Sequence, residues 1–211
     1  MDNYVITIAR GFGSGGKQIG LRLSKKLGIP CYESQILQMA SDYSGINKSL
    51  FVKADERING KKIAMALKKF PKMNRLAQPS QRSFVSDVNL FNIQAEIIRE
   101  LAKTESCIII GKCANYILKD YDNVVSVYVE APRRFCRATI MDRLDVTAQE
   151  ADQMIYQTDK YRSDYYSYYT GGGYWTDPVA YDMTLNSERI GYDDCADLIA
   201  HFKDVRLRKK G

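Results

Sequence analysis

The chain has 211 residues, of which 45% are hydrophobic and 27% are charged. These fractions are close to those of typical soluble proteins and exclude an intrinsically disordered chain. The 31 basic and 25 acidic residues give a formal net charge of +6, a modest excess that favours anionic ligands without identifying them.

The sequence has no pattern typical of a membrane-spanning helix, an export signal or a redox-active cysteine pair. No apolar run reaches the roughly 18 residues that a membrane-spanning helix needs, so no membrane partner is expected. The amino terminus lacks the basic segment and apolar stretch of an export signal, which predicts a cytoplasmic protein. The five cysteines include no C-x-x-C pair and are expected to stay reduced. His201 is the only histidine, so any general base has to be a carboxylate.

The first predicted elements are a strand over residues 4–9 and a helix over residues 19–27, separated by a glycine-rich turn. The turn, residues 11–18, reads Gly-Phe-Gly-Ser-Gly-Gly-Lys-Gln. Such glycines let backbone N–H groups surround an anion, the helix directs its positive end at that anion, and Lys17 can reach the outer phosphates. The residues predicted to bind nucleotide phosphates are Gly11, Gly13, Ser14, Gly15, Gly16, Lys17 and Gln18.

Two other interpretations of this turn stay open. Gly11, Gly13 and Gly16 also match G-x-G-x-x-G, and Glu33 lies near the distance at which a dinucleotide-binding fold places its ribose-binding acid. An ordinary glycine-rich loop is the other alternative. Lys17 favours a triphosphate-binding loop, because a cation directly at the helix start suits terminal phosphates and is not needed for a pyrophosphate bridge.

The rest of the chain alternates strand-like and helical segments. Short apolar runs predict strands over residues 31–32, 107–110, 124–129 and 182–186. Helical periodicity predicts helices over residues 33–43, 47–58, 61–70, 87–103, 132–144 and 191–202, and a long helix that starts with the capping box Thr147-Ala-Gln-Glu150. Residues 71–86 have no periodicity and are predicted to form a loop. This alternation predicts an α/β fold in which helices cover both faces of a parallel sheet.

Three segments at the predicted carboxyl ends of strands carry groups suited to phosphoryl transfer. They are the glycine-rich turn, Glu33 and Gly111-Lys112, and ligands of open parallel sheets bind at this edge. Lys112 is expected to hold the phosphate of an acceptor. The basic residues expected to form a cationic lid are Arg137, Arg143, Lys160 and Arg162, although each one alone is also compatible with an ordinary surface charge.

The segment from Tyr161 to Gly171 has an unusual composition, with five tyrosines among its first nine residues. Stacked aromatic rings beside cations can bind the bases of single-stranded nucleic acid, which is one hypothesis for this segment. The alternative is that the tyrosines share one helix face and pack into the core. The four tyrosines that would share this face are Tyr161, Tyr165, Tyr168 and Tyr169.

Taken together, these residues resemble the cytidylate kinase-like family of P-loop proteins, relatives of the nucleoside monophosphate kinases. The resemblance extends over nearly the whole chain and rests on four ordered blocks. The first block reads Ile6-Thr-Ile-Ala-Arg-Gly-Phe-Gly-Ser-Gly-Gly-Lys17, followed by Ile19-Gly20. The other blocks are Gly28-Ile-Pro-Cys-Tyr-Glu33, Ile108-Ile-Ile-Gly-Lys-Cys-Ala114 with Tyr116-Ile-Leu118, and Asp159-Lys-Tyr-Arg162 with Tyr165-Tyr166 and Tyr168-Tyr-Thr-Gly171.

The resemblance implies a single domain over residues 1–211, with a P-loop NTPase-type parallel sheet of five strands flanked by helices. It implies a helical acceptor-binding region over roughly residues 33–86 and a lid-like helical hairpin over roughly residues 132–175. The implied reaction transfers the γ-phosphoryl group of ATP, with Mg²⁺, to a nucleoside monophosphate such as CMP or dCMP. The implied roles are ATP binding for residues 11–18, acceptor binding for Glu33, Lys112, Asp159 and Lys160, and catalysis for Lys17, Arg137, Arg143 and Arg162.

Three departures from the family pattern keep other functions open. Gln18 stands where a Ser or Thr hydroxyl would meet magnesium, and Lys112 replaces the usual arginine. No Asp or Glu ends the predicted strand over residues 107–110, so the metal ligands are not identified. The alternatives are a nucleotide sensor with weak or no turnover, a nucleic-acid-binding protein on the same fold, and a kinase that acts on a small molecule other than a nucleotide.

Overall fold

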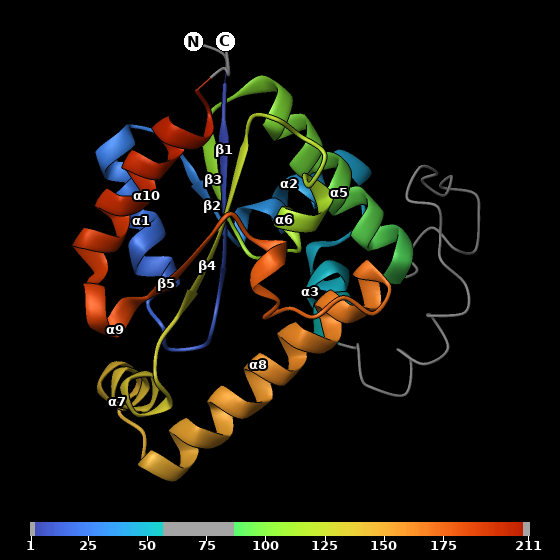
Figure 1. Ribbon diagram of the computed structural model, residues 1–211. Coiled ribbons are helices and arrows are strands. Elements are labelled where there is room, and N and C mark those ends of the chain that lie inside the picture. Colours follow the sequence, from blue (N-terminus) through green and yellow to red (C-terminus); the bar gives the residue numbers. More distant parts are fainter. Residues whose placement is uncertain (1–2, 57–86, 209–211) are drawn as a thin grey trace.

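The computed structural model describes residues 3–56 and 87–208, and its centre is a parallel sheet of five strands in the order β2-β3-β1-β4-β5 (Figure 1). The strands are β1 (Val5–Arg10), β2 (Cys31–Tyr32), β3 (Cys107–Ile110), β4 (Val124–Glu130) and β5 (Met183–Asn186). The central strands β1, β3 and β4 are buried along almost their whole length, as expected for strands covered on both sides. The predicted α/β class and its five-stranded parallel sheet are therefore confirmed.

Helices cover both faces of this sheet (Figure 1). One face carries α1 (Gly16–Leu27) and α10 (Tyr192–Arg206), which pack together, with the short α9 (Ser187–Ile190) leading into α10. The other face carries α5 (Asp87–Thr104) and α6 (Ala114–Ile117), and α2 (Gln35–Ser44) and α3 (Lys48–Glu56) pack on α5. Of the helices described, none is both long and apolar enough to cross a membrane.

Two further helices, α7 (Arg133–Leu144) and α8 (Ala148–Thr170), form a hairpin that extends beyond the carboxyl ends of the strands (Figure 1). The 3₁₀ helix η1 (Pro178–Ala180) follows before β5. Thr147 and Glu150 make the predicted capping box at the start of α8, because each side chain accepts a hydrogen bond from the backbone N–H of the other. The α7–α8 hairpin therefore lies at the edge of the sheet where ligands of parallel sheets bind.

Successive side chains of β1 point to opposite faces of the sheet, so they belong to two separate layers of the core. Ile6 and Ile8 pack with Ile19 of α1 on one face of the sheet. Val5 belongs to a second cluster, which contains Phe91 of α5, on the other face. Because close packing on both faces resists displacement, β1 gives the glycine-rich turn that follows it a fixed starting point.

Most predicted elements are present with small shifts at their ends. The prediction that a helix starts at residue 33 is wrong, because α2 begins at Gln35 after Ser34 at the N-cap position, and Glu33 lies in the turn after β2. The last helix ends at Arg206 and not at residue 202. The short helices α6 and α9 were not predicted, since four residues are too few to show a helical period. The helix and loop predicted within residues 61–86 lie outside the described residues.

The tyrosine-rich part of α8 packs into the protein core. Tyr165, Tyr166 and Tyr169 are all buried, and the ring of Tyr169 stacks on Phe91 with a centroid separation of 3.7 Å. The packed-face interpretation of this segment is therefore confirmed. Tyr161 and Tyr168 are partly buried and pack against the same cluster, so all four tyrosines predicted to share a helix face contact the core.

Candidate active site

The glycine-rich turn connects β1 to α1 at the carboxyl edge of the sheet. Gly13 and Gly15 have φ values of 90° and 82°, a left-handed conformation that residues with a side chain rarely adopt. The Oγ of Ser14 is fully buried and donates hydrogen bonds to the carbonyl oxygens of Gly11 and Val129, at 2.9 and 3.0 Å. The Ser14 N–H donates to the carbonyl oxygen of Gly11, and the Ser14 carbonyl oxygen accepts from Oγ of Ser187 at 2.6 Å. Ser14 therefore shapes the loop with both its side chain and its backbone, and the structure gives no support to a phosphate-binding role for it.

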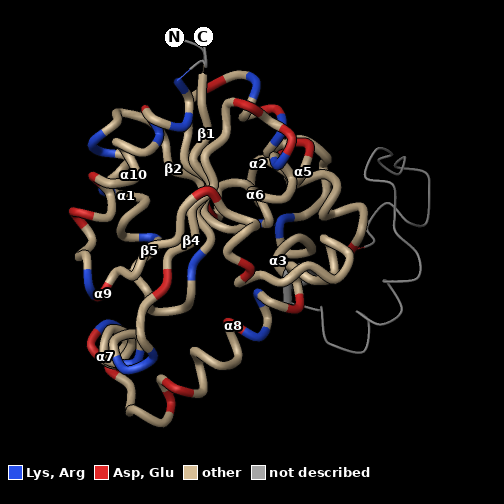
Figure 2. Tube along the Cα trace, in the orientation of Figure 1, with Lys and Arg blue, Asp and Glu red and all other residues tan. Residues whose placement is uncertain are grey.

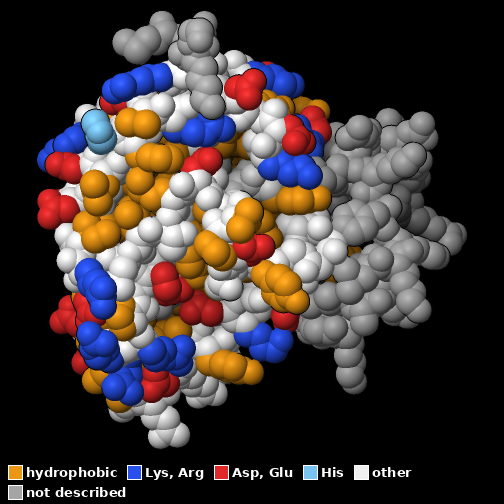
Figure 3. All heavy atoms as spheres, viewed as in Figure 1, with side chains coloured by type: hydrophobic (Ala, Val, Ile, Leu, Met, Phe, Trp, Pro, Cys, Tyr) orange, Lys and Arg blue, Asp and Glu red, His pale blue; other side chains and the backbone are white. Residues whose placement is uncertain are grey.

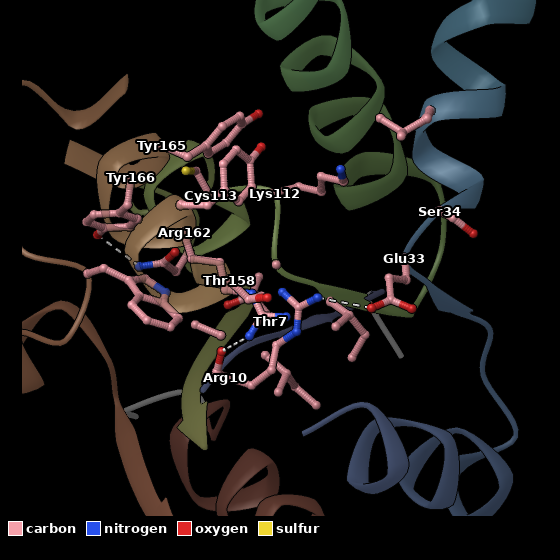
Figure 4. A pocket seen from close by; sticks show the side chains of 18 of the residues that line it. Thr7, Arg10, Glu33, Ser34, Lys112, Cys113, Thr158, Arg162, Tyr165 and Tyr166 are labelled. Carbon is pink, nitrogen blue, oxygen red and sulfur yellow. Dashed lines mark hydrogen bonds and ion pairs between the residues drawn. The ribbon is translucent and has the colours of Figure 1, made fainter. Parts of the chain in front are cut away.

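Lys17 lies in the first turn of α1 and pairs with Glu33, which lies just after β2. The Lys17 Nζ is 2.7 Å from Oε2 of Glu33, and Oε1 of the same carboxylate is 3.0 Å from Nη2 of Arg10 (Figure 4). Burial would raise the pKa of Glu33, but the hydrogen bond from Lys17 and the charge of Arg10 outweigh it and hold that pKa below its ordinary value. Glu33 is thus a carboxylate at neutral pH and bridges two cations.

A cavity of about 340 Å³ lies next to this bridge, beyond the carboxyl ends of β1 and β3 (Figure 4). Among the described residues that line it, three are cationic and one is acidic, which favours an anionic ligand. The charged lining residues are Arg10, Glu33, Lys112 and Arg162. The aromatic lining residues are Tyr161, Tyr165, Tyr166 and Trp175.

Arg162 and Asp159, one turn apart on α8, both contact the loop backbone. Nη1 of Arg162 donates to the carbonyl oxygen of Arg10 at 2.9 Å, and the N–H of Phe12 donates to Oδ1 of Asp159 at 2.8 Å. Burial and the neighbouring charge of Arg10 lower the pKa of Arg162 to about 10, so this residue stays cationic at neutral pH. Burial raises the pKa of Asp159, against the opposing effects of the Phe12 N–H and the Arg162 charge.

Lys112 follows β3 in an unusual stretch of backbone. Gly111, Lys112 and Cys113 have φ values of 73°, 60° and 53°, so three consecutive residues are left-handed. Non-glycine residues in this region carry strain that the surrounding structure has to stabilise, and such strain clusters at functional sites. A Cβ on Gly111 would lie 2.2 Å from Nη1 of Arg10, which shows how closely the guanidinium group approaches this turn.

Of the other basic residues predicted to serve the site, Arg143 lies beside the loop and Lys160 lies on the surface. Arg143, at the end of α7, places its guanidinium carbon 5.6 Å from the centre of the Phe12 ring, beside the glycine-rich turn. Lys160 pairs with Asp164 on the same helix at 2.7 Å, half exposed, and does not line the cavity. The structure therefore brings Arg143 to the loop but gives no support to an acceptor-binding role for Lys160.

Basic residues gather on α7 (Figures 2 and 3), and most of them are engaged in ion pairs. Arg133 and Arg137 both pair with Asp152 of α8, at 2.9 and 3.1 Å. Arg134 pairs with Glu188 of α9 at 2.9 Å. Arg137 thus holds the two helices of the hairpin together and lies outside the cavity lining, so its predicted catalytic role stays a prediction.

Reasoning from the sequence missed three residues of the site: Arg10, Phe12 and Glu130. Arg10 and Glu130 are the last residues of β1 and β4. A charged residue at the end of an apolar strand is the same signal that identified Lys112, and it was available at both positions. Glu130 lies so close to the loop that a Cβ on Gly11 would be 2.3 Å from its Oε1.

The carboxylates near the loop already have partners within the protein. The described residues contain no group of three or more His, Cys, Asp and Glu that could hold a metal by themselves. Mg²⁺ is usually held by one or two carboxylates together with substrate phosphates and water, so a cluster of this size is not required. Glu33 pairs with Lys17 and Arg10, and Glu130 accepts hydrogen bonds from the Tyr128 hydroxyl and the Ala131 N–H, so the structure assigns neither carboxylate to a metal.

A parallel sheet in the order β2-β3-β1-β4-β5, with a glycine-rich phosphate loop after β1 and a cavity at the same edge, defines the P-loop kinase class of phosphotransferases. The chain belongs to the cytidylate kinase-like family, whose model matches residues 5–189.

Solved structures show the same fold at low sequence identity. An uncharacterized protein from Eubacterium ventriosum ATCC 27560 is 24% identical, with a TM-score of 0.69 over 96% of this chain and 99% of that chain. A shikimate kinase from Acinetobacter baumannii in complex with shikimate is 13% identical, with a TM-score of 0.50 over 98% and 96%. A sugar kinase from Janibacter sp. HTCC2649 is 12% identical, with a TM-score of 0.51 over 97% and 96%. No curated protein matches this chain.

Proposed function

We propose that the protein transfers the γ-phosphoryl group of ATP to a nucleoside monophosphate, with CMP or dCMP as the first candidates. One observation carries this proposal: Glu33 joins Lys17 of the phosphate loop to Arg10 of the neighbouring anion-binding cavity. The donor and acceptor sites are thus adjacent, as direct phosphoryl transfer requires. Membership in the cytidylate kinase-like family supports a cytidine nucleotide as the acceptor.

The donor would be held by the backbone N–H groups of residues 13 and 15–18 and by Lys17 at the start of α1. The positive end of α1 and the lysine both favour the charge on the phosphates. The protein carboxylates nearest the loop are Glu33 and Glu130, and either would have to exchange its present partners to help hold Mg²⁺, which when bound would offset the charge of the phosphates. Gln18 offers an amide oxygen where related loops have a hydroxyl.

The acceptor phosphate would bind to the cationic wall of the cavity, formed by Arg10, Lys112 and Arg162. The aromatic residues of the lining suit the uncharged portion of a nucleoside. Phosphoryl transfer depends mainly on positioning and on stabilising the charge on the transferred oxygens, so it requires no histidine. Arg143 and Arg162, which both approach the Phe12 ring, would supply this stabilisation.

The direct test incubates the purified protein with ATP, Mg²⁺ and a panel of nucleoside monophosphates, and measures diphosphate formation. Shikimate, the ligand of one structural neighbour, serves as a non-nucleotide acceptor in the same panel. We expect turnover with CMP or dCMP, and a loss of about 10²–10³-fold in Lys17→Ala, the scale seen when one charge-stabilising donor is removed.

Lys26→Ala is the matched control, because Lys26 lies on the same helix and pairs with Asp197 on the surface. It should keep the activity of the unmodified protein. Failure of the unmodified protein to phosphorylate any acceptor in the panel would contradict the proposal, as would equal activity of Lys17→Ala.

A nucleotide sensor is the second candidate, and the observation that favours it is Gln18 in place of the magnesium-binding hydroxyl. A sensor would bind ATP without forming a diphosphate from any acceptor. Calorimetric titration with a non-hydrolysable ATP analogue, run beside the turnover assay, separates the two functions. Binding with turnover supports the kinase, and binding without turnover supports the sensor.

A further inference from the structure

Phe12, the second residue of the phosphate loop, contributes its side chain to the core of the α7–α8 hairpin. The loop itself is made of glycine and small polar residues, and Phe12 is its only large apolar residue. Its ring packs against a cluster whose buried members are Ala131, Cys136, Ile140, Ala151 and Ile155. One residue of the phosphate-binding segment therefore belongs to the packing of the hairpin.

Two arginines of the hairpin meet at this ring. The guanidinium carbons of Arg143 and Arg162 each lie 5.6 Å from the centre of the Phe12 ring. Arg143 comes from the last turn of α7 and Arg162 from the second half of α8. Two guanidinium groups placed close together repel each other. The electron-rich face of an aromatic ring attracts cations, so the Phe12 ring offsets part of this repulsion and favours having both arginines beside it.

The backbone of the loop is attached to the same part of α8. The N–H of Phe12 donates to Asp159, and Arg162 donates to the carbonyl oxygen of Arg10, so the chain is held on both sides of Gly11. Asp159 also pairs with Arg162 at 3.4 Å. This hydrogen-bonded connection is independent of the ring contact, and the two together make the loop and this turn of α8 a single packed unit.

We infer that Phe12 is a positioning residue, which places the guanidinium groups of Arg143 and Arg162 beside the phosphate loop. The inference rests on the proposed function, in which these arginines stabilise the transferred phosphoryl group. Phe12 itself touches no reacting atom. Its contribution is to hold in place two cations that come from different helices.

Substitutions at position 12 distinguish a positioning role for Phe12 from a purely structural one. If the ring only fills the hairpin core, leucine should replace it well, since leucine is apolar and of similar volume. If the ring positions the arginines, leucine should fail, because it fills the space without attracting a cation. Tyrosine keeps the aromatic face and should restore function in the second case.

The experiment compares Phe12→Leu and Phe12→Tyr with the unmodified protein by steady-state kinetics. We expect Phe12→Leu to lower kcat about tenfold, which corresponds to about 1.4 kcal/mol, with little change in the KM for ATP. Phe12→Tyr should restore most of kcat. Phe135→Leu is the matched control, because Phe135 packs on the same cluster and its ring meets Tyr192 edge-on at 6.3 Å.

A second measurement does not depend on turnover. Hydrogen exchange is followed in peptides covering α7 and α8, with and without a non-hydrolysable ATP analogue. In the unmodified protein and in Phe12→Tyr the analogue should slow exchange in the hairpin, and in Phe12→Leu this slowing should be lost. The inference is overturned if Phe12→Leu matches the unmodified protein in both measurements, or if the analogue binds without changing exchange in the hairpin.

These outcomes separate the inference from the function on which it rests. A protein that phosphorylates no acceptor, yet shows Phe12-dependent protection of the hairpin, contradicts the proposed function alone. If the unmodified protein phosphorylates an acceptor and Phe12→Leu matches it in both turnover and hydrogen exchange, the inference alone is contradicted.

Discussion

Glu33 is the residue on which the geometry of the site depends most. Its carboxylate contacts Lys17 of the loop and Arg10 of the cavity, and both Glu33 and Arg10 have largely buried side chains. Removing a carboxylate of this kind leaves a buried guanidinium group without its partner, which costs more than the pair itself contributes. The bridge is therefore expected to stabilise the fold as well as to organise the site.

The first prediction concerns the pH dependence of this bridge. Glu33→Gln should lower the melting temperature at pH 7, with a loss of roughly 1–3 kcal/mol of folding free energy. The pKa of Glu33 is lowered in the folded protein. Its carboxylate therefore contributes fully to the folding free energy above its ordinary pKa of about 4.3, and this contribution is lost as the pH falls through the pKa of the folded protein. Thermal denaturation of both proteins from pH 3 to 8 should show a gap in melting temperature that narrows only below about pH 4.

Burial raises the pKa of Asp159, so this residue favours the folded state more as the pH falls. The unmodified protein and Glu33→Gln both contain Asp159, so its effect cancels when their melting temperatures are compared. A gap that stays constant down to pH 3 would show that the charge of Glu33 makes no net contribution.

The second prediction concerns the turn after β3. Gly111→Ala places a methyl group 2.2 Å from the Arg10 guanidinium and requires a non-glycine residue at φ 73°. It should displace Arg10, raise the KM for the acceptor and cost roughly 1–3 kcal/mol of stability. Gly45→Ala is the matched control, since Gly45 has φ 71° and a methyl group added there would meet nothing within 4 Å. Equal KM values for the two variants would argue against a role for Arg10 in acceptor binding.

At the scale of elements, α8 has two distinct parts. Its first half pairs with α7 through Asp152, and its second half packs into the core through Tyr165 and Tyr169. Asp159 and Arg162, between these parts, are fastened to the loop backbone. A movement of the whole hairpin as one rigid lid would therefore have to break these two hydrogen bonds.

The third prediction tests the start of this helix. Thr147→Ala removes the side chain that caps α8 and should cost about 1 kcal/mol, or roughly 2–4 °C in melting temperature. Thr104→Ala is a suitable control, because the Thr104 hydroxyl donates to the Glu100 carbonyl at the end of α5 and caps no helix start. Thermal denaturation by circular dichroism measures both variants, and equal melting temperatures would contradict the predicted role of the cap.

At the scale of the whole molecule, the sheet brings together segments that lie far apart in the chain. Parallel strands end at one edge, so the loop after β1, Glu33 after β2 and Lys112 after β3 meet there. Helix α8 and strand β4 add Arg162 and Glu130 to the same edge. Binding of a nucleotide should therefore stabilise several elements at once.

The fourth prediction follows from this convergence. An ATP analogue with Mg²⁺ at about 100 times its dissociation constant should add about 2.7 kcal/mol of stability and raise the melting temperature by roughly 5–10 °C. Lys17→Ala should show a much smaller increase at the same concentration, and Lys26→Ala the full increase. Differential scanning fluorimetry provides the measurement, and the same shift in Lys17→Ala would place the nucleotide away from the loop.

The elements that could be predicted from the sequence are those specified by local pattern. The apolar runs of β1, β3 and β4, the capping box of α8 and the glycine-rich turn each depend on neighbouring residues, and the structure has all of them. The four-residue helices α6 and α9 could not be predicted, because they are shorter than the pattern that identifies a helix.

By itself the sequence determined the fold class, the phosphate loop with Lys17, and the set of strand ends that meet at one edge. Only the tertiary structure decided which cations share the site. It brought Arg10 and Arg162 to the cavity and Arg143 to Phe12, and it placed Lys160 in a surface ion pair with Asp164. The reason is physical: a helix presents side chains all around its axis, and the partner of each charge is set by packing between elements that no local pattern records.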